Sequence, residues 1–573
     1  MSAPRPAGRL ARTLGVLQGR VLGLPPARTR YSVHKDLRVP TRDDAVLLTD
    51  HYIPERDPRG TVLIRSVYGR GLPHSLYGRA FAARGYHVVL QSVRGTAGST
   101  GTFRPIVQEA DDAQDTVAWL RTRDWFDGRL ATFGGSYLGW AQWALLQDPP
   151  PELRAAAVVV GPHDFQQAIN GTGALALADF LTWSANVEAQ GLGGVRGLRA
   201  MLAARGRLAA AWSEPTAAAA ATVALGGSAP WFREWLDHPH GDDPYWADYR
   251  AEQALERVDV PVLLFGGWHD VFLDQTLHQY EVLRRHNPSV ALTVGPWTHM
   301  DTAAKATRVI DAQVLRWLDL HMGTEDTSAG GTAAGPGGTA GVTAPVEIFH
   351  TGANTWLSLP SWPPAATGHT LWLRADGGLG QDPDEGEVGF RHDPADPTPS
   401  LGGRHMSPKA GPADVRSLEQ RADTLAFTGA ALTEPVDVIG TPHVEFELTV
   451  DTPHADVFVR LCDVDGRGRS HVVTERFERL SPAPVEATTI RLELGACAHR
   501  FAAGHRIRLD FSGGAHPRYD RGTGTDTPGV PAPVGHRIGV ATSRLTLPVV
   551  EDSALDSPEG ATEGVTLAVR GDR

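Results

Sequence analysis

Between residues 31 and 165, short aliphatic runs alternate with amphipathic stretches, and this alternation restricts the possible folds more than any other feature. The runs have the length and the β-branched content of buried strands, whereas the stretches between them have helical periodicity. Such an alternation predicts an α/β fold with a mainly parallel, doubly wound sheet and helices on both faces. The expected strands are Thr61–Ile64, His87–Leu90, Leu130–Phe133 and Ala155–Val160.

A helical insertion interrupts this pattern. Residues 166–250 show no comparable strand pattern, are rich in alanine and contain Trp183, Trp212, Trp231 and Trp235. Insertions at the carboxyl ends of strands in an open α/β sheet tend to lie over the binding site, so we expect a helical cap here. The α/β pattern resumes over 251–322, with expected strands at Pro261–Phe265 and Ser289–Val294 and a helix from Lys305 to about Met322.

A run of small residues divides the chain after residue 322. Residues 323–344 are mostly Gly, Ala and Thr, a composition typical of flexible linkers. Beyond them, alternating runs such as HVEFELTV and HRIRLDF are separated by Gly, Pro and Asp turns, which predicts an all-β sandwich or jelly roll over 345–550. Residues 1–30 are expected to form a loose basic leader with partial disorder, and 551–573 a tail.

The charge and the cysteines restrict the partners and the location of the chain. Its 573 residues carry a net charge of −12, which argues against nucleic acid or an anionic membrane as partner and favours a small-molecule ligand. No stretch approaches the roughly 20 apolar residues of a membrane helix. The only cysteines, Cys462 and Cys497, favour the reducing cytoplasm, although one bridge between them stays open. The arginine-rich leader lacks the continuous apolar region of a signal peptide.

The segment LATFGGSYLGW carries the strongest chemical signal. Gly134, Gly135 and Ser136 follow an expected strand and precede the helical run WAQWALL. Small residues beside a serine let the chain turn sharply and expose the hydroxyl at the end of the strand, as in a nucleophile elbow. Leu138 stands where the common five-residue form has glycine, so the segment by itself also fits a structural turn.

Two further polar residues complete the order Ser, Asp, His. Asp270 follows one expected strand, in LLFGGWHDVF, and His299 follows the next, in LTVGPWTHM, which is the chain order of α/β-hydrolases. His299 would accept the proton of Ser136, and Asp270 would fix the imidazole tautomer and stabilise the imidazolium. The backbone N–H of Tyr137 and the phenol of Tyr68 are the expected donors to the oxyanion.

Structural roles remain open for each of these residues. Taken alone, Asp270 could cap a helix, His299 could be an ordinary histidine among 23, and Tyr68 could pack in a turn. His269 is expected to be structural, because adjacent residues of an extended segment point in opposite directions. No metal and no cofactor is expected, because the sequence contains no His-Glu-x-x-His pair, no dinucleotide fingerprint, no P-loop and no paired cysteine ligands.

Four aromatic residues flank the expected catalytic residues in the sequence and are candidates for substrate binding. Bulky rings bury ligand surface and exclude water, so we expect them to line an acyl or aromatic pocket, with core packing as the alternative. The four are Trp140, Trp268, Phe272 and Trp297.

Several segments jointly resemble the cocaine esterase and X-Pro dipeptidyl-peptidase family of serine hydrolases, from about residue 31 to 550. VRGTAGSTGTF, EADDAQDTVAWL and GGSYLG are similar to the family's Arg-Gly loop, acidic helix and elbow, so Leu138 agrees with this family. GGWHDVF, GPWTH and RSVYGR resemble the segments that carry the acid, the base and an oxyanion tyrosine, although relatives often have an aromatic residue in place of His269. GANTWLSLPSWPP, DVFVRLCDV and GHRIRLDFSGGAHPRYDR resemble its C-terminal jelly roll, a galactose-binding-like domain.

The resemblance implies a serine hydrolase that cleaves esters or acyl amides through an acyl-enzyme intermediate. X-Pro dipeptidyl-peptidase activity is the alternative, and it would need carboxylates near the acyl pocket to bind a free α-amino group. The sequence points to no such cluster. A non-catalytic carbohydrate-binding protein is a third hypothesis, which the intact Ser, Asp and His set disfavours. The fold and the catalytic residues do not determine which leaving group the enzyme accepts.

Overall fold

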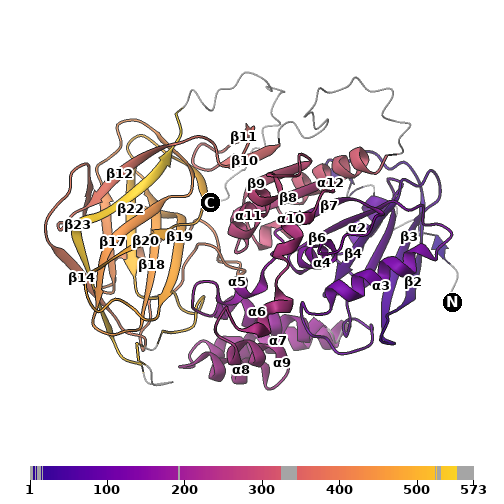
Figure 1. Cartoon of the computed structure of the whole chain (residues 1–573), viewed down its shortest axis with the longest axis horizontal. Coiled ribbons are helices and arrows are strands. Elements are labelled where there is room, and N and C mark those ends of the chain that lie inside the picture. Colours follow the sequence, from indigo (N-terminus) through magenta and orange to yellow (C-terminus); the bar gives the residue numbers. More distant parts are fainter. Residues whose placement is uncertain are drawn as a thin grey trace.

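The computed structural model describes residues 4–6, 8, 15, 17, 19–190, 194–323, 345–522, 524–525 and 531–551. These residues form two large sheets, one within an α/β part and one in a β-rich C-terminal part (Figure 1). Apart from their first residues, the predicted linker and the predicted tail lie outside the described residues. In the described part of the chain, no helix combines the length and the apolar character needed to cross a membrane.

The first sheet has eleven strands, and its central strands, from β5 to β10 in spatial order, run parallel. Strands β4, β5 and β8 are buried along their whole length, because helices cover the sheet on both faces. The predicted α/β class is therefore confirmed. In spatial order the strands are β1 (Arg5–Pro6), β2 (Tyr31–Pro40), β3 (Val46–Pro54), β5 (His87–Ser92), β4 (Thr61–Ser66), β6 (Leu130–Gly135), β7 (Leu153–Val159), β8 (Val262–His269), β9 (Val290–Thr298), β10 (Val346–His350) and β11 (Thr355–Leu359).

Helices connect the parallel strands and pack on the sheet. The first, α2 (Ser75–Ala82), packs on β3 and β5, and α4 (Tyr137–Leu146) packs on β4, β6 and β7. Helix α3 (Glu109–Arg121) packs against α4, while α11 (Leu273–Leu283) contacts β8 and β9. Helix α12 (Thr307–His321) packs on β7 and β8 and occupies the range predicted for the last helix of this part. Every residue of α4 is buried, so the helix after Ser136 is held on all sides.

The segment predicted as a helical cap consists of helices, among which α6 packs against α7, α8 and α9 (Figure 1). Local sequence defines their ends: the Thr216 hydroxyl accepts the N–H of Ala219 at the start of α8, and Gly226, with φ 58°, ends that helix. The helices are α5 (Phe165–Asn170), α6 (Leu177–Gln190), α7 (Gly194–Ala211), α8 (Ala217–Leu225), α9 (Pro230–Asp237) and the 3-10 helix η1 (Pro244–Tyr249), followed by α10 (Glu252–Arg257).

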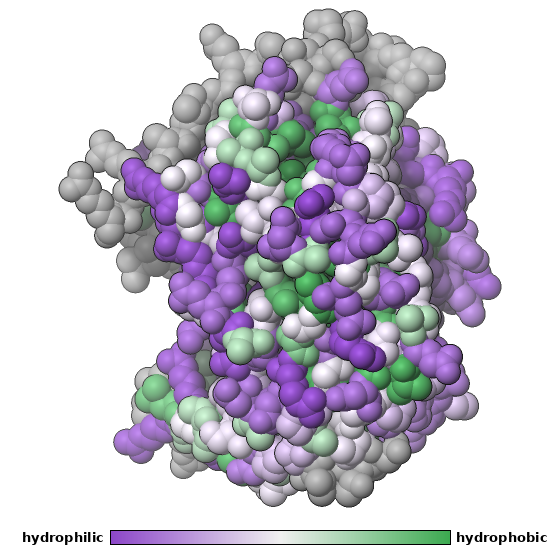
Figure 2. Space-filling model, turned by 90° about the vertical axis from the view of Figure 1, so that its left-hand side faces the viewer, coloured by the Kyte–Doolittle hydropathy of each residue, from purple (hydrophilic) through white to green (hydrophobic). Residues whose placement is uncertain are grey.

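The C-terminal part forms a sheet of twelve strands with its own hydrophobic core. Alternate residues of β17 are buried, as expected for a strand with one face on a core. Figure 2 shows the outer side of this part, where hydrophilic residues predominate and hydrophobic residues are scattered. Its elements are β12 (Thr367–Leu373), β13 (Gly378–Gly380), β14 (Glu387–His392), α13 (Arg416–Glu419), β15 (Thr424–Gly429), β16 (Val436–Gly440), β17 (His443–Val450), β18 (Ala455–Val464), β19 (Ser470–Leu480), β20 (Thr488–Glu493), β21 (Cys497–Phe501), β22 (Arg506–Ser512) and β23 (Val534–Val549).

The structure differs from the predicted organisation at two places. Strands β10 and β11, expected in the C-terminal domain, extend the first sheet instead, because β10 pairs in parallel with β9 and covers what would otherwise be its open edge. Part of the predicted leader is also packed on the core. Leu24 is buried, and the backbone N–H groups of Arg28 and Thr29 donate to the carbonyl of Ala83.

Candidate active site

Ser136 lies in a tight turn between β6 and α4. Its backbone has φ 58° and ψ −124°, a strained conformation for a residue other than glycine. The flanking glycines are required for this turn: a Cβ on Gly134 would lie 2.5 Å from Leu138 Cβ, and one on Gly139 would lie 2.5 Å from Gly161 Cα. The strained turn places Ser136 at the N-terminus of α4, the geometry of a nucleophile elbow.

Asp270 and His299 meet because they leave neighbouring strands side by side. His269, the last residue of β8, pairs with Thr298, the last residue of β9. The next residues are Asp270 and His299, and His299 Nδ1 lies 2.6 Å from Asp270 Oδ1. On its other side, His299 Nε2 lies 3.0 Å from Ser136 Oγ. The three residues predicted from the sequence therefore form one hydrogen-bonded chain.

The environment of Asp270 determines how the hydrogen-bonded set of Ser136, His299 and Asp270 can act. Its side chain is fully buried, and its Oδ2 accepts the N–H of Phe272 at 3.0 Å. An ionised carboxylate facing His299 Nδ1 accepts a hydrogen bond from the N–H at that position, which leaves Nε2 as the acceptor for the Ser136 hydroxyl. This arrangement is suited to removing the serine proton during attack on a carbonyl carbon.

Two hydrogen-bond donors lie next to Ser136. Tyr137 is the first residue of α4, so its N–H has no intrahelical acceptor and lies at the positive end of the helix dipole. The Tyr68 hydroxyl accepts the indole N–H of Trp183 at 3.1 Å, and Tyr68 lines the same cavity as Ser136. Burial raises the pKa of the Tyr68 phenol, so the phenol keeps the proton that it would donate to an oxyanion.

The Tyr137 side chain anchors the elbow in the core. Its hydroxyl donates to Glu109 Oε1 at 2.8 Å and accepts the N–H of Ile106 at 3.1 Å. Glu109 is buried, which raises its pKa, and it pairs with the buried guanidinium of Arg65 at 2.7 Å. The network connects α3, α4 and β4, and so holds the start of α4 in place.

A cavity of about 340 Å³ adjoins Ser136 and His299. This volume is typical of sites for small molecules. The cavity is bounded by the elbow, by α6 of the cap, by the loop after β9 and by one segment of the C-terminal part. Its lining includes Tyr68, Tyr77, Phe133, Leu138, Asp179, Trp183, Ile310 and Met406.

Asp179 is a buried carboxylate in this otherwise largely apolar lining. The side chain lies on α6, and the residue is only 3% exposed. Its Oδ1 accepts the N–H of Met406 at 2.7 Å, while Oδ2 is buried and has no hydrogen-bond partner in the part of the chain that the structure describes. Burial raises the pKa of Asp179 to about 6. At neutral pH the cavity therefore contains a negative charge with an unused acceptor.

The four aromatic residues predicted to bind substrate do not line the cavity, which corrects that expectation. Trp140, Trp268 and Trp297 are buried and pack on other aromatic rings, and the first two donate their indole N–H groups to backbone carbonyls. Phe272 contacts the His299 ring edge-on, with the ring centroids 5.3 Å apart. Neighbours in a strand or helix point in other directions than the catalytic residue, so proximity in sequence does not place them in the same cavity.

Sequence reasoning missed Asp179 and Met406 as site residues and assigned Trp183 only to the cap. A single acid among apolar residues in LALADFLTW was the available signal, because an unpaired carboxylate is rarely buried without a function. No sequence signal indicates Met406. His269 is buried at the end of β8, where burial lowers the pKa of its imidazole to about 4.

The fold and the hydrogen-bonded set of serine, histidine and aspartate define a serine hydrolase of the α/β-hydrolase type. Residues 43–301 match the model of the X-Pro dipeptidyl-peptidase (S15) family, and residues 340–542 match that of the X-Pro dipeptidyl-peptidase C-terminal non-catalytic domain. The chain is 30% identical over 546 residues to the cocaine esterase of Rhodococcus sp. (strain MB1 Bresler), covering 86% of this chain and 93% of that enzyme. It therefore belongs to the cocaine esterase and X-Pro dipeptidyl-peptidase family.

Solved structures show the same fold over most of the chain. An aminopeptidase from the marine sediment archaeon Thaumarchaeota archaeon superposes with a TM-score of 0.74 at 23% identity, covering 91% of this chain and 97% of that chain. An α-amino acid ester hydrolase superposes with a TM-score of 0.74 at 22% identity and the same coverage. Both matches extend through the α/β part and the β-rich C-terminal part.

Proposed function

We propose that this enzyme hydrolyses carboxylic esters of small molecules, with acyl amides as related substrates, through Ser136, His299 and Asp270. The observation that carries this proposal is the continuous chain of hydrogen bonds from Asp270 through His299 to Ser136, which ends at the cavity. The similarity to a cocaine esterase supports an ester as the preferred substrate.

The geometry supports a two-step reaction. Ser136 Oγ attacks the carbonyl carbon while His299 Nε2 accepts its proton, and Asp270 stabilises the imidazolium. The Tyr137 N–H and the Tyr68 hydroxyl donate to the oxyanion. His299 then gives the proton to the leaving group, and the acyl group stays on Ser136. In the second step His299 deprotonates a water molecule, whose oxygen attacks the acyl carbon. The bond from that carbon to Ser136 Oγ then breaks, His299 returns the proton to Oγ, and the acid is released.

The location and the partner are part of the same proposal. We place the enzyme in the cytoplasm, and the buried free thiols of Cys462 and Cys497 support a reducing compartment. The net charge of −12 supports a small-molecule substrate over nucleic acid. Alternating burial along strands such as β17 supports the interpretation of the C-terminal part as a jelly roll.

The function is tested by comparing an ester with a dipeptide anilide. Initial rates of 4-nitrophenol release from 4-nitrophenyl acetate and of 4-nitroaniline release from Gly-Pro-4-nitroanilide are measured with the wild-type enzyme. We expect ester turnover to exceed anilide turnover clearly. Turnover of the anilide alone would contradict the proposal and assign the enzyme to the dipeptidyl-peptidases.

Replacing Tyr68 with phenylalanine is expected to lower kcat for 4-nitrophenyl acetate about 100-fold, with little change in KM. The phenol donates to charge that develops only in the transition state, so its loss affects the chemical step more than binding. Tyr77→Phe is the matched control, because Tyr77 also lines the cavity. A Tyr68→Phe enzyme as active as the control would exclude the phenol from the oxyanion site.

Asp179 favours a second candidate function, the hydrolysis of substrates that carry a protonated amine on the acyl side. Its Oδ2 is buried beside the cavity and has no hydrogen-bond partner among the residues that the structure describes, and an ammonium group placed there would satisfy it. Such a carboxylate is what a dipeptidyl-peptidase or an amino-ester hydrolase needs to bind a free α-amino group.

Asp179→Asn tests this candidate with a pair of equally sized esters, alanine methyl ester and methyl propionate, and acid release is followed by titration. We expect the substitution to lower kcat/KM for the amino ester about 10- to 100-fold relative to the propionate, the effect of losing one charged hydrogen bond. Since the pKa of Asp179 is raised to about 6, the wild-type preference should be present above pH 6 and lost below it. Equal losses for both esters would give Asp179 a structural role only.

A further inference from the structure

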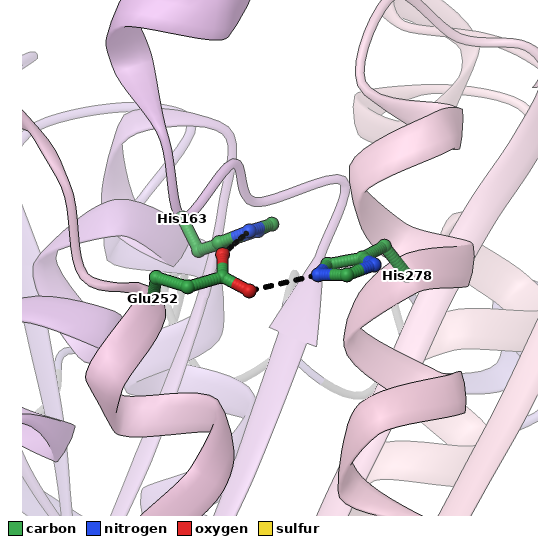
Figure 3. Close-up of side chains that lie close together, drawn as sticks. All are labelled: His163, Glu252 and His278. Carbon is green, nitrogen blue, oxygen red and sulfur yellow. Dashed lines mark hydrogen bonds and ion pairs between the residues drawn. The ribbon is translucent and has the colours of Figure 1, made fainter.

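Two histidines and a glutamate converge at the base of the cap, apart from the cavity that contains Ser136 (Figure 3). His163 lies between β7 and α5, Glu252 is the first residue of α10, and His278 lies in α11. Glu252 Oε2 is 2.7 Å from His163 Nε2, and Oε1 is 2.9 Å from His278 Nε2. The imidazole rings are nearly parallel, with an interplanar angle of 20° and centroids 5.5 Å apart.

These three side chains offer the ligand set that a zinc-like ion prefers. Imidazole nitrogens and carboxylate oxygens bind zinc at about 2.0–2.2 Å. One ligand atom from each residue lies within 4.8 Å of the other two, so small side-chain rotations bring all three to a common centre. The His163 side chain is only 3% exposed, whereas those of Glu252 and His278 are 50% and 46% exposed. An ion can therefore enter from solvent, and a water molecule can occupy the fourth position.

A buried amide beside His163 provides a second, independent observation. Gln279 is fully buried; its Nε2 donates to the Gly161 carbonyl at 2.7 Å and lies 3.1 Å from His163 Nδ1. Its Oε1 has no hydrogen-bond partner among the described residues. A histidine bound to metal through Nε2 carries its proton on Nδ1 and needs an acceptor there. A rotated Gln279 amide supplies that acceptor once its oxygen moves away from the Gly161 carbonyl, to which the amide nitrogen now donates at 2.7 Å. The Gly161 carbonyl then keeps the indole N–H of Trp143 at 3.2 Å.

We propose that His163, Glu252 and His278 bind one divalent transition-metal ion, best matched by Zn²⁺, and that the ion fastens the cap to the core. The chain enters the cap just after His163 and leaves it just before Glu252, and the N–H of Ala251 donates to the His163 carbonyl at 2.8 Å. His278 lies on α11, the helix that follows Asp270, so the ion would also be bound by this helix. The ion would thus join both stems of the cap to the element next to the catalytic aspartate, in a structural rather than a catalytic role.

The binding test uses the full chain after dialysis against a chelator. Calorimetric titration of the wild type with ZnCl₂ is expected to show one high-affinity equivalent, and excess Zn²⁺ is expected to raise the midpoint of thermal unfolding by several degrees. His278→Gln should lower the affinity at least about tenfold and remove most of that increase. Glu252→Gln should have the same effect, which guards against a folding defect in one variant.

The matched control is His240→Gln, because His240 is an exposed cap histidine outside the cluster. The control should bind Zn²⁺ as tightly as the wild type. The proposal is overturned if the wild type binds no Zn²⁺, or if His278→Gln and Glu252→Gln bind it as tightly as the control. In that case the three residues form only a hydrogen-bonded cluster. Since binding is measured directly, this outcome is independent of whether the enzyme hydrolyses esters.

Discussion

Replacing Ser136 with alanine is expected to lower kcat for 4-nitrophenyl acetate by a factor on the order of 10⁵, while the protein stays folded. Alanine removes the only atom that can form the acyl-enzyme, whereas the oxyanion donors and the cavity remain and support slow attack by water. The β-carbon and the strained turn are retained, so the elbow itself should persist.

Steady-state ester hydrolysis and circular dichroism of both proteins measure this effect. Ser99→Ala is the matched control, because Ser99 also lies in a glycine-rich segment, but its hydroxyl accepts the backbone N–H of Leu48 and donates to the carbonyl of Ser92. It should keep a kcat close to that of the wild type. If a folded Ser136→Ala enzyme retained more than about a hundredth of the wild-type kcat, the assigned nucleophile would be wrong.

The second large effect is expected for Asp270→Asn, with a fall in kcat of about 10⁴-fold. The amide has the size of the carboxylate but no charge to stabilise the imidazolium. It also presents an N–H group toward His299 Nδ1 or loses the bond to the N–H of Phe272, since its single oxygen cannot accept both. In the first orientation the amide N–H favours the wrong imidazole tautomer. In the second, the lost bond to Phe272 disturbs the loop after Asp270.

Asp274→Asn provides the comparison for this prediction. Asp274 lies one helical turn further along and pairs with Arg404, but its side chain is 56% exposed. Its substitution should change kcat by less than about threefold, because Arg404 keeps its bonds to the carbonyls of Trp268 and Ala496 and Asp274 does not line the cavity. The rates are measured with 4-nitrophenyl acetate across neutral and alkaline pH. A similar loss in both variants would mean that Asp270 acts through stability and not through His299.

Much of the fold follows from local patterns, because the buried strands of a parallel sheet have a distinctive composition. The run Leu130–Phe133 indicated β6 within two residues, and the helix after Ser136 was equally clear. The pairing of β10 with β9 could not be predicted in this way. A pattern of alternating residues identifies a strand but not its partner, and this pairing joins segments on opposite sides of the linker.

The candidate site likewise contains residues that could be predicted from the sequence and residues that could not. Ser136, Asp270 and His299 could be predicted because each follows a strand and the chain order is characteristic. The cavity could not, since its walls come from α6 and from Met406, which are distant in sequence from the elbow and from each other. The cluster of His163, Glu252 and His278 could not be predicted for a related reason: its members lie on three separate elements, with no regular spacing.

The bond from the Met406 N–H to Asp179 has a consequence for the biosynthesis of the enzyme. Ser136, Asp270 and His299 all precede the linker, so the three catalytic residues are synthesised before the C-terminal part. One wall of the substrate cavity, however, emerges only with Met406. Before Met406 is synthesised, Asp179 lacks its backbone partner, and the substrate cavity is incomplete. A complete active site therefore requires synthesis of the C-terminal part, even though the three catalytic residues precede it in the sequence.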